Sequence, residues 1–80
     1  MSTSAIRIEP LAVDVAFVGD ALHVRLADGR EVSAPLEWFP RLRDATEAQR
    51  RHWRVIGGGV GLHWPDVDED ISVAGLLATH

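Results

Sequence analysis

The sequence contains no cysteine, and this absence excludes two kinds of structure. Disulfide bridges and thiolate metal sites both need cysteine, so neither is expected here, and a reducing compartment fits the composition. Long apolar runs are also missing, since the longest fall far short of the roughly 20 residues that cross a bilayer. The first ten residues lack the apolar block of a signal peptide. We therefore expect a cytoplasmic protein with no membrane contact.

Positive charge is the scarcer sign. Eight Lys and Arg residues stand against 12 Asp and Glu residues, which gives a net charge of -4. Sequence-independent binding to nucleic acid depends on neutralising phosphates with a basic surface, so direct nucleic-acid binding is not expected. A local basic cluster is interpreted as a solvated face, with a docking patch for an acidic partner or nucleic acid as the alternative. Its members are Arg41, Arg43, Arg50, Arg51 and Arg54.

The remaining composition is that of an ordinary globular protein, 46% hydrophobic and 25% charged. Eighty residues is one domain's worth of chain. A domain near this size buries roughly 60–65% of its unfolded surface, so its core is modest. We expect residues 1–10 to be a loose leader and residues 11–80 to be a single domain.

Alternation of apolar and polar residues predicts an antiparallel three-stranded meander over about residues 12–18, 21–27 and 30–34. A two-residue turn at Gly19-Asp20 places every apolar residue opposite another apolar residue, for example Val13 opposite Leu26. The outer edges of such a meander could pair with a second copy, which would give a homo-oligomer.

The second turn of the meander allows two registers. A two-residue Asp28-Gly29 turn would mix the two faces of the sheet. A three-residue turn, Ala27 to Gly29, instead pairs Val24 with Val32 and places Gly29 in a left-handed conformation. We predict the three-residue turn, because a one-residue slip turns a whole strand inside out.

The second half of the chain predicts short elements that complete an α+β fold. Thr46 to Gln49 forms a capping-box pattern, which indicates a helix over about residues 46–54. A short hairpin over about residues 53–64 follows, with three glycines at its turn. Asp66 to Asp70 is expected to be an acidic loop, and Ser72 to cap a short C-terminal helix over about residues 72–78.

One glycine-rich segment and one acidic segment each match a known ligand-binding motif only in part. The Gly57 to Gly61 segment is followed by no helix start and no Lys-Ser/Thr pair, so it is interpreted as a turn and not a phosphate loop. The acidic segment starting at Asp66 matches the first positions of a calcium loop. It then has Ile71 where glycine is needed and Leu77 where a bidentate glutamate is needed. We expect no metal site and no cofactor.

The histidines form no pattern of metal ligands or catalytic residues. We therefore expect no enzyme. The alternative is a small-ligand-binding or enzymatic domain that uses His63 with Asp68 or Asp70. That alternative requires His63 and one of the carboxylates to converge in a concave pocket.

Three tryptophans in so short a chain can supply either core area or an anchor for a partner. Two segments combine an aromatic residue with proline and charged residues, and we interpret them as a surface that contacts a protein partner. The candidate partner-binding residues are Trp38, Phe39, Arg41, His63, Trp64, Asp66, Asp68 and Asp70.

The same segments carry a family resemblance that covers about residues 12–78. Asp28-Gly29-Arg30, the run Pro35 to Leu42, the run Gly59 to Pro65 and the run Asp68 to Ser72 resemble the bacterial domain-of-unknown-function family 2442 (DUF2442). The resemblance implies a small α+β fold with no assigned enzymatic activity. It also implies a gene beside that of a second small protein, in an arrangement like that of a toxin and its antitoxin.

The hypothesis from the sequence is therefore a small, non-enzymatic protein-binding or regulatory module, antitoxin-like, that acts with a neighbouring small protein. The resemblance also implies that some family members are fused to a helix-turn-helix domain. Eighty residues leave no room for such a fusion. A DNA-associated component of a transcriptional regulator is accordingly the alternative and not the first expectation.

Overall fold

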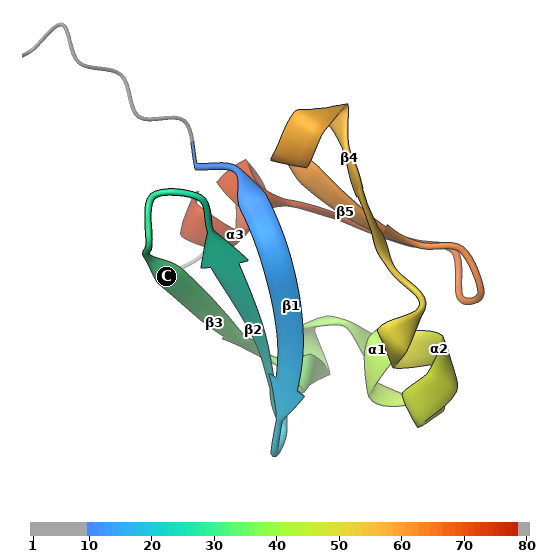
Figure 1. The fold of residues 1–80 in the computed structure, drawn as a ribbon. Helices are drawn as coiled ribbons and strands as arrows, with labels where there is room; N and C mark the ends of the chain where they lie inside the picture. The colour runs from blue at the N-terminus through green and yellow to red at the C-terminus, as the bar shows by residue number, and fades with distance from the viewer. Residues whose placement is uncertain (1–9, 79–80) are drawn as a thin grey trace, which may run out of the picture.

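The computed structural model describes residues 10–78, so the predicted leader lies almost wholly outside the described residues. Two three-stranded antiparallel sheets form the domain, with strand orders β1-β2-β3 and β4-β5-β6 (Figure 1). This confirms the α+β class, although the sequence predicted only two strands in the second sheet. The strands are β1 (Ala12–Val18), β2 (Ala21–Leu26), β3 (Glu31–Pro35), β4 (Arg54–Ile56), β5 (Gly61–Trp64) and β6 (Glu69–Ser72).

The first sheet has the predicted turns. Two residues, Gly19 and Asp20, connect β1 to β2, with Gly19 at a φ of 57°. The N–H of Leu26 donates to the carbonyl oxygen of Arg30 at 2.8 Å, which leaves the three residues from Ala27 to Gly29 in the second turn, and Gly29 is left-handed with a φ of 94°. Val24 lies opposite Val32, as expected. Turn geometry and hydrophobic alternation thus determine the same register.

One predicted pair in this sheet is wrong. Leu26 lies opposite Ala12 and not opposite Val13, because the register shifts between Ala12 and Asp14. An extra residue on one strand bulges out of the ladder and turns away from the face that its neighbours share. Val13 is consequently 47% exposed, and the smaller Ala12 takes its place in the core.

The acidic segment of the second sheet differs most from expectation. Only its first part is a turn, in which Asp68 has a φ of 53°. The chain then enters β6, where Asp70 lies opposite His63 and Ile71 lies opposite Leu62. Ile71 is buried, and its packing opposite Leu62 helps to stabilise this acidic strand beside β5.

Short helices complete the fold. Pro35 precedes the first of them, and Pro40 begins the second. The capping box of Thr46 is present, but the helix it begins ends before His52 instead of near residue 54. Ser72 caps the last helix by accepting from the N–H of Gly75 at 2.9 Å. The helices are η2 (Leu36–Trp38), α1 (Pro40–Arg43), α2 (Glu47–Arg51), η3 (Gly57–Gly59) and α3 (Val73–Ala78).

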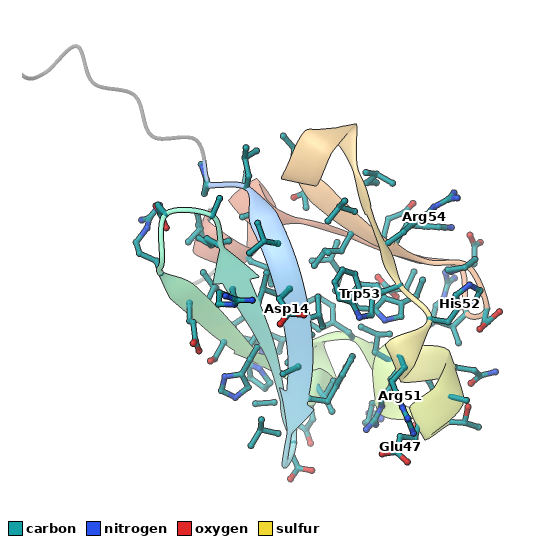
Figure 2. All side chains as sticks on the ribbon, viewed as in Figure 1. Asp14, Glu47, Arg51, His52, Trp53 and Arg54 are labelled. Atoms are coloured by element: carbon teal, nitrogen blue, oxygen red, sulfur yellow. The ribbon has the colours of Figure 1, made fainter. Side chains whose placement is uncertain are left out.

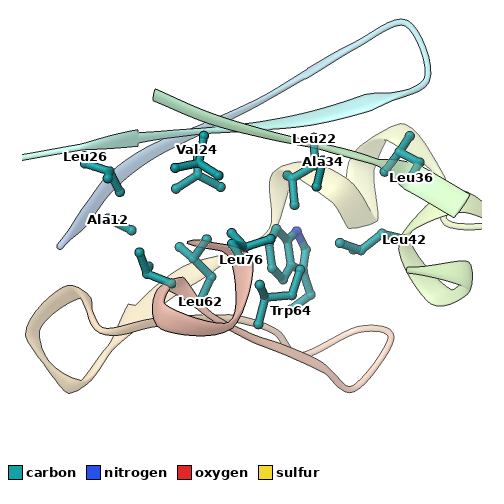
Figure 3. Close-up of a cluster of buried hydrophobic side chains, with 13 residues drawn as sticks. Ala12, Leu22, Val24, Leu26, Ala34, Leu36, Leu42, Leu62, Trp64 and Leu76 are labelled. Atoms are coloured by element: carbon teal, nitrogen blue, oxygen red, sulfur yellow. The ribbon is translucent and has the colours of Figure 1, made fainter. Parts of the chain in front are cut away.

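The core lies between the two sheets (Figure 3). Trp64 is fully buried at its centre, and its ring meets that of Phe17 edge-on with a centroid separation of 6.4 Å. Burying such side chains contributes roughly 1.5–3 kcal/mol each. The buried residues are Ala12, Leu22, Val24, Leu26, Val32, Ala34, Leu36, Leu42, Leu62, Trp64, Ile71, Val73 and Leu76.

Arg50 connects the helical end to both sheets. Its guanidinium donates to the carbonyl oxygens of Leu42 at 2.9 Å and Arg43 at 2.8 Å, and it stacks over Phe17 at 5.3 Å from the ring centroid. The indole N–H of Trp64 donates to the carbonyl oxygen of Arg50 at 3.0 Å. The bonds from Arg50 reach carbonyl groups at the end of α1, and the bond from Trp64 reaches one at the end of α2, where helix carbonyls lack partners within the helix. Within residues 10–78, no helix has the length and apolar character needed to span a membrane.

Candidate functional site

The structure brings together the two segments that the sequence marked as a contact surface. The guanidinium of Arg41, on α1, donates to the carbonyl oxygen of Asp68 at 2.6 Å. Trp38 and Phe39, next to it in the chain, face the same groove as Asp70 of β6. Residues about 30 positions apart in the sequence therefore form one continuous surface.

This surface contains a groove with a volume of about 520 Å³. One side is formed by η2 and the start of α1, and the other by β6 and α3. Among the described residues that line the groove, Asp70 is the only charged one, and its carboxylate is largely exposed. Mostly apolar concave sites with a few polar groups are the usual form of binding sites. The lining residues are Trp38, Phe39, Asp70, Ile71, Ser72, Gly75 and Leu76.

Trp38 stands at the edge of this groove with 49% of its surface exposed. It ends η2, and Pro40 begins α1 at the second residue beyond it. Proline fixes its own φ and restricts the residue before it, so the backbone is restricted at Phe39 and Pro40, directly after Trp38. Among the phenylalanine and tryptophan side chains from residue 10 to 78, it is the most exposed.

The other two tryptophans have structural positions. Trp64 was a candidate contact residue, but it is fully buried and cannot present its ring to a partner. Alternation along β5 explains this, since Trp64 shares the inward face with Leu62. Trp53 is half-buried and packs against the core, and Figure 2 shows it between β1 and β4.

Two histidine–aspartate pairs lie on the second sheet and beside it. The Nδ1 atom of His63 is within hydrogen-bond reach of Asp70 on the neighbouring strand. The Nδ1 atom of His52 lies 2.9 Å from a carboxylate oxygen of Asp66. His63 and Asp70 therefore do meet, but His63 does not line the groove that Asp70 lines. A molecule in that groove would contact Asp70 and not the imidazole of His63.

The basic cluster of the sequence does not form one free cationic face. Arg41 and Arg50 bind backbone carbonyls, as described above. Arg43 forms an ion pair with Asp44 at 3.0 Å, and Arg51 forms one with Glu47 at 3.2 Å. The hydrogen bond from Arg43 lowers the pKa of Asp44 below its ordinary value, and the same contact raises the pKa of Arg43.

No group of three or more His, Cys, Asp or Glu residues in the described part of the chain is arranged to hold a metal ion. Asp66, Asp68 and Asp70 separate in space because β6 begins within the predicted loop. Asp66 pairs with His52, and Asp70 pairs with His63.

The sequence did not reveal the floor of the groove. Ile71, Ser72, Gly75 and Leu76 line it, and none of them was proposed as a site residue. The available signal was the change from acidic residues to an apolar residue at Ile71, followed by the helix cap at Ser72. That pattern predicted the helix but not the strand that precedes it.

The fold and groove define a small α+β domain with two facing three-stranded sheets and an apolar groove beside one outer strand. A family model described as "Protein of unknown function (DUF2442)" matches residues 12–79, and the chain belongs to this family. It is similar to a protein of unknown function from Rhodospirillum rubrum whose crystal structure is known. The two share 30% identity over 89% of this chain and 88% of that chain, with a TM-score of 0.74. No curated protein matches the chain.

Proposed function

We propose that the protein is a non-enzymatic protein-binding module, an antitoxin-like regulatory component that acts with a small protein encoded beside it. The observation that supports this proposal best is the groove with Trp38 at its edge. The antitoxin-like part of the proposal draws on the gene arrangement that the family resemblance implies.

The physical chemistry of the groove suits a protein partner. Tryptophan is enriched among the few residues that dominate binding energy at interfaces, where a large rigid ring is buried against the partner. Trp38 is half-exposed in the free chain, so a partner can bury the rest of its ring. The two residues that follow it, Phe39 and Pro40, have backbones restricted by the proline ring, which reduces the backbone entropy lost on binding.

Co-expression with the neighbouring protein tests the proposal. We expect the two proteins to co-purify, and we expect the chain to relieve any growth inhibition caused by its neighbour. Trp38→Ala should weaken the complex by about 30-fold, which corresponds to about 2 kcal/mol at an interface hot spot. Isothermal titration calorimetry with the purified proteins measures this loss.

Val18→Ala is the matched control, because Val18 is a 60% exposed apolar residue at the tip of the first hairpin, away from the groove lining. It should leave the affinity unchanged. Failure of the two proteins to co-purify would contradict the proposed function. Equal effects of the two substitutions would contradict the assignment of the groove as the contact surface.

A DNA-associated role has less support from the geometry. Four arginines of the basic cluster have side-chain partners within the chain, and only Arg54 of that cluster makes no side-chain hydrogen bond or ion pair with another described residue. Salt-dependent binding to duplex DNA would be the result that favours this alternative.

A further inference from the structure

Each sheet has two outer strands, and three of these four edges are obstructed. On β1, a carboxylate oxygen of Asp14 accepts from the N–H of Val15 at 2.9 Å, and the register shift beginning at Ala12 interrupts the edge. On β3, Pro35 ends the strand and has no N–H to donate. The edge strand β4 has only three residues. Bulges, prolines and short strands are the usual means by which proteins prevent edge pairing.

The remaining edge belongs to β6. The N–H of Val73 donates to the carbonyl oxygen of Val60 at 3.0 Å, so these two residues form a hydrogen-bonded pair of the β5–β6 ladder. Hydrogen-bonded and non-hydrogen-bonded pairs alternate along an antiparallel ladder. Ile71 therefore bonds to β5, whereas the backbone groups of Asp70 and the N–H of Ser72 point away from it.

A contact within the chain lies at the turn that leads into this edge. The carbonyl oxygen of Asp68, which precedes β6, accepts from the guanidinium of Arg41 at 2.6 Å. Two residues further along, Asp70 presents both an N–H and a C=O in the outward direction. These are the two groups that one residue of an added antiparallel strand needs for a hydrogen-bonded pair.

The groove lies directly beside this edge and determines which side chains an added strand must carry. Successive side chains of a strand point to opposite faces. A residue opposite Asp70 would point to the outer face, toward a carboxylate, where a basic side chain is favoured. The residues on either side of it would point inward, toward Ile71, Leu76 and Trp38, where apolar side chains are favoured.

We propose that the partner binds through an extended segment that adds to β6 as a fourth strand of the second sheet. The segment has the pattern apolar–basic–apolar, with its basic residue opposite Asp70 and its apolar residues in the groove. This inference rests on the proposed function and specifies the chemistry of the partner's binding segment.

A second copy of the chain fits this edge less well. Pairing two β6 strands antiparallel would bring Glu69 and Asp70 of one copy close to those of the other. Like charges on adjacent strands are destabilising, and the chain already carries a net charge of -4. The charge of the edge therefore favours a partner segment of opposite sign.

Selection of random eight-residue peptides displayed on phage against the purified full chain tests the inference. We expect enrichment of peptides with the apolar–basic–apolar pattern. Asp70→Pro removes the outward N–H but leaves the bonds from β6 to β5, because those come from the neighbouring residues. It should weaken binding of a selected peptide by about tenfold or more beyond Asp70→Ala, which removes only the carboxylate.

Ser33→Pro on the other sheet is the matched control, because by the same alternation its N–H also points outward from an edge strand. It should leave peptide binding unchanged. Should Asp70→Pro fail to fold, the selected peptide is instead N-methylated at single backbone positions. Methylation at alternate residues should abolish binding to the wild-type chain, and methylation at the residues between them should not.

Several results would overturn the inference. One is that the selection enriches no peptide, or enriches acidic or helix-patterned peptides. Another is that folded Asp70→Pro and folded Asp70→Ala bind the selected peptide equally. A wild-type dimer in analytical ultracentrifugation that Asp70→Pro dissociates would assign the edge to a second copy instead. If Trp38→Ala weakens the complex with the neighbouring protein but Asp70→Pro does not, strand addition fails and the proposed function stands. If the neighbouring protein does not bind at all, the proposed function fails, whatever the peptides show.

Discussion

Replacing Arg50 by alanine should destabilise the fold far more than its place on the helix suggests. Its partly buried hydrogen bond to the carbonyl of Leu42 contributes about 1.5 kcal/mol, and its more exposed bond to that of Arg43 about 1 kcal/mol. The cation–π contact with Phe17 adds about 0.5 kcal/mol. The expected loss is therefore about 3 kcal/mol. For a domain of this size that corresponds to a fall in Tm of roughly 12–24 °C.

The adjacent residue provides the control. Arg51 is on the same short helix and has the same chemistry, but its only ion pair with a described residue is to Glu47, and Figure 2 shows both side chains pointing outward. These side chains are 73% and 83% exposed. Arg51→Ala should cost about 0.3–0.5 kcal/mol, the usual value for an exposed pair of this spacing.

Urea unfolding followed by tryptophan fluorescence measures both variants, since Trp64 is buried in the core. Arg50→Lys should lose about half of the 3 kcal/mol, because lysine keeps the charge but not the planar donors that reach two carbonyls and stack on a ring. If Arg50→Ala and Arg51→Ala differ by less than about 1 kcal/mol with equal m values, the role assigned to Arg50 is wrong.

Three further predictions concern single local features. Thr46→Ala removes the capping box and should cost about 1 kcal/mol in urea unfolding. Gly59→Ala should cost about 2 kcal/mol or more in the same assay, because its φ is 116° and an added Cβ would lie 3.0 Å from the chain that leads into β1. Gly58→Ala, where a Cβ meets open space, should cost about 1 kcal/mol. The backbone N–H of Arg30 lowers the pKa of Asp28, so this carboxylate stabilises the fold above its ordinary pKa and ceases to do so as pH falls through the lowered value. The Tm difference between the wild type and Asp28→Asn should accordingly shrink from neutral pH to about pH 2.

The first sheet could be predicted because its information is local. Alternating residues define the faces of each strand, and the two turns then leave one register that keeps those faces together. The bulge at Val13 escaped this reasoning, since Val13 fits the alternation better than Ala12 does. Next to the bulge, the Gly59 turn comes close to Leu11 and Ala12, and a contact of this kind between distant parts of the chain cannot be predicted from local alternation.

Arg50 shows a second limit of the sequence. Arg50 and Arg51 are neighbours of the same type on a predicted helix, and the sequence offers no ground for separating them. Their roles differ because one points toward Phe17 and the end of α1, whereas the other points to solvent. Only the packing of the helix against the sheet makes that distinction.

The exposed side chains of the candidate site could be predicted from the sequence, but its exposed backbone edge could not. Trp38, Phe39 and Asp70 were recognised from their residue types, and all three line the groove. The strand edge beside them could not be recognised, because the sequence of Glu69 and Asp70 predicts a solvated loop. Only the structure shows that these residues pair with β5. A sequence can show that a strand edge is obstructed, for example by a proline or by an aspartate whose side chain accepts from a backbone N–H of the edge. An unobstructed edge has no such signature, and it becomes visible only once the ladder register shows which N–H and C=O groups face outward.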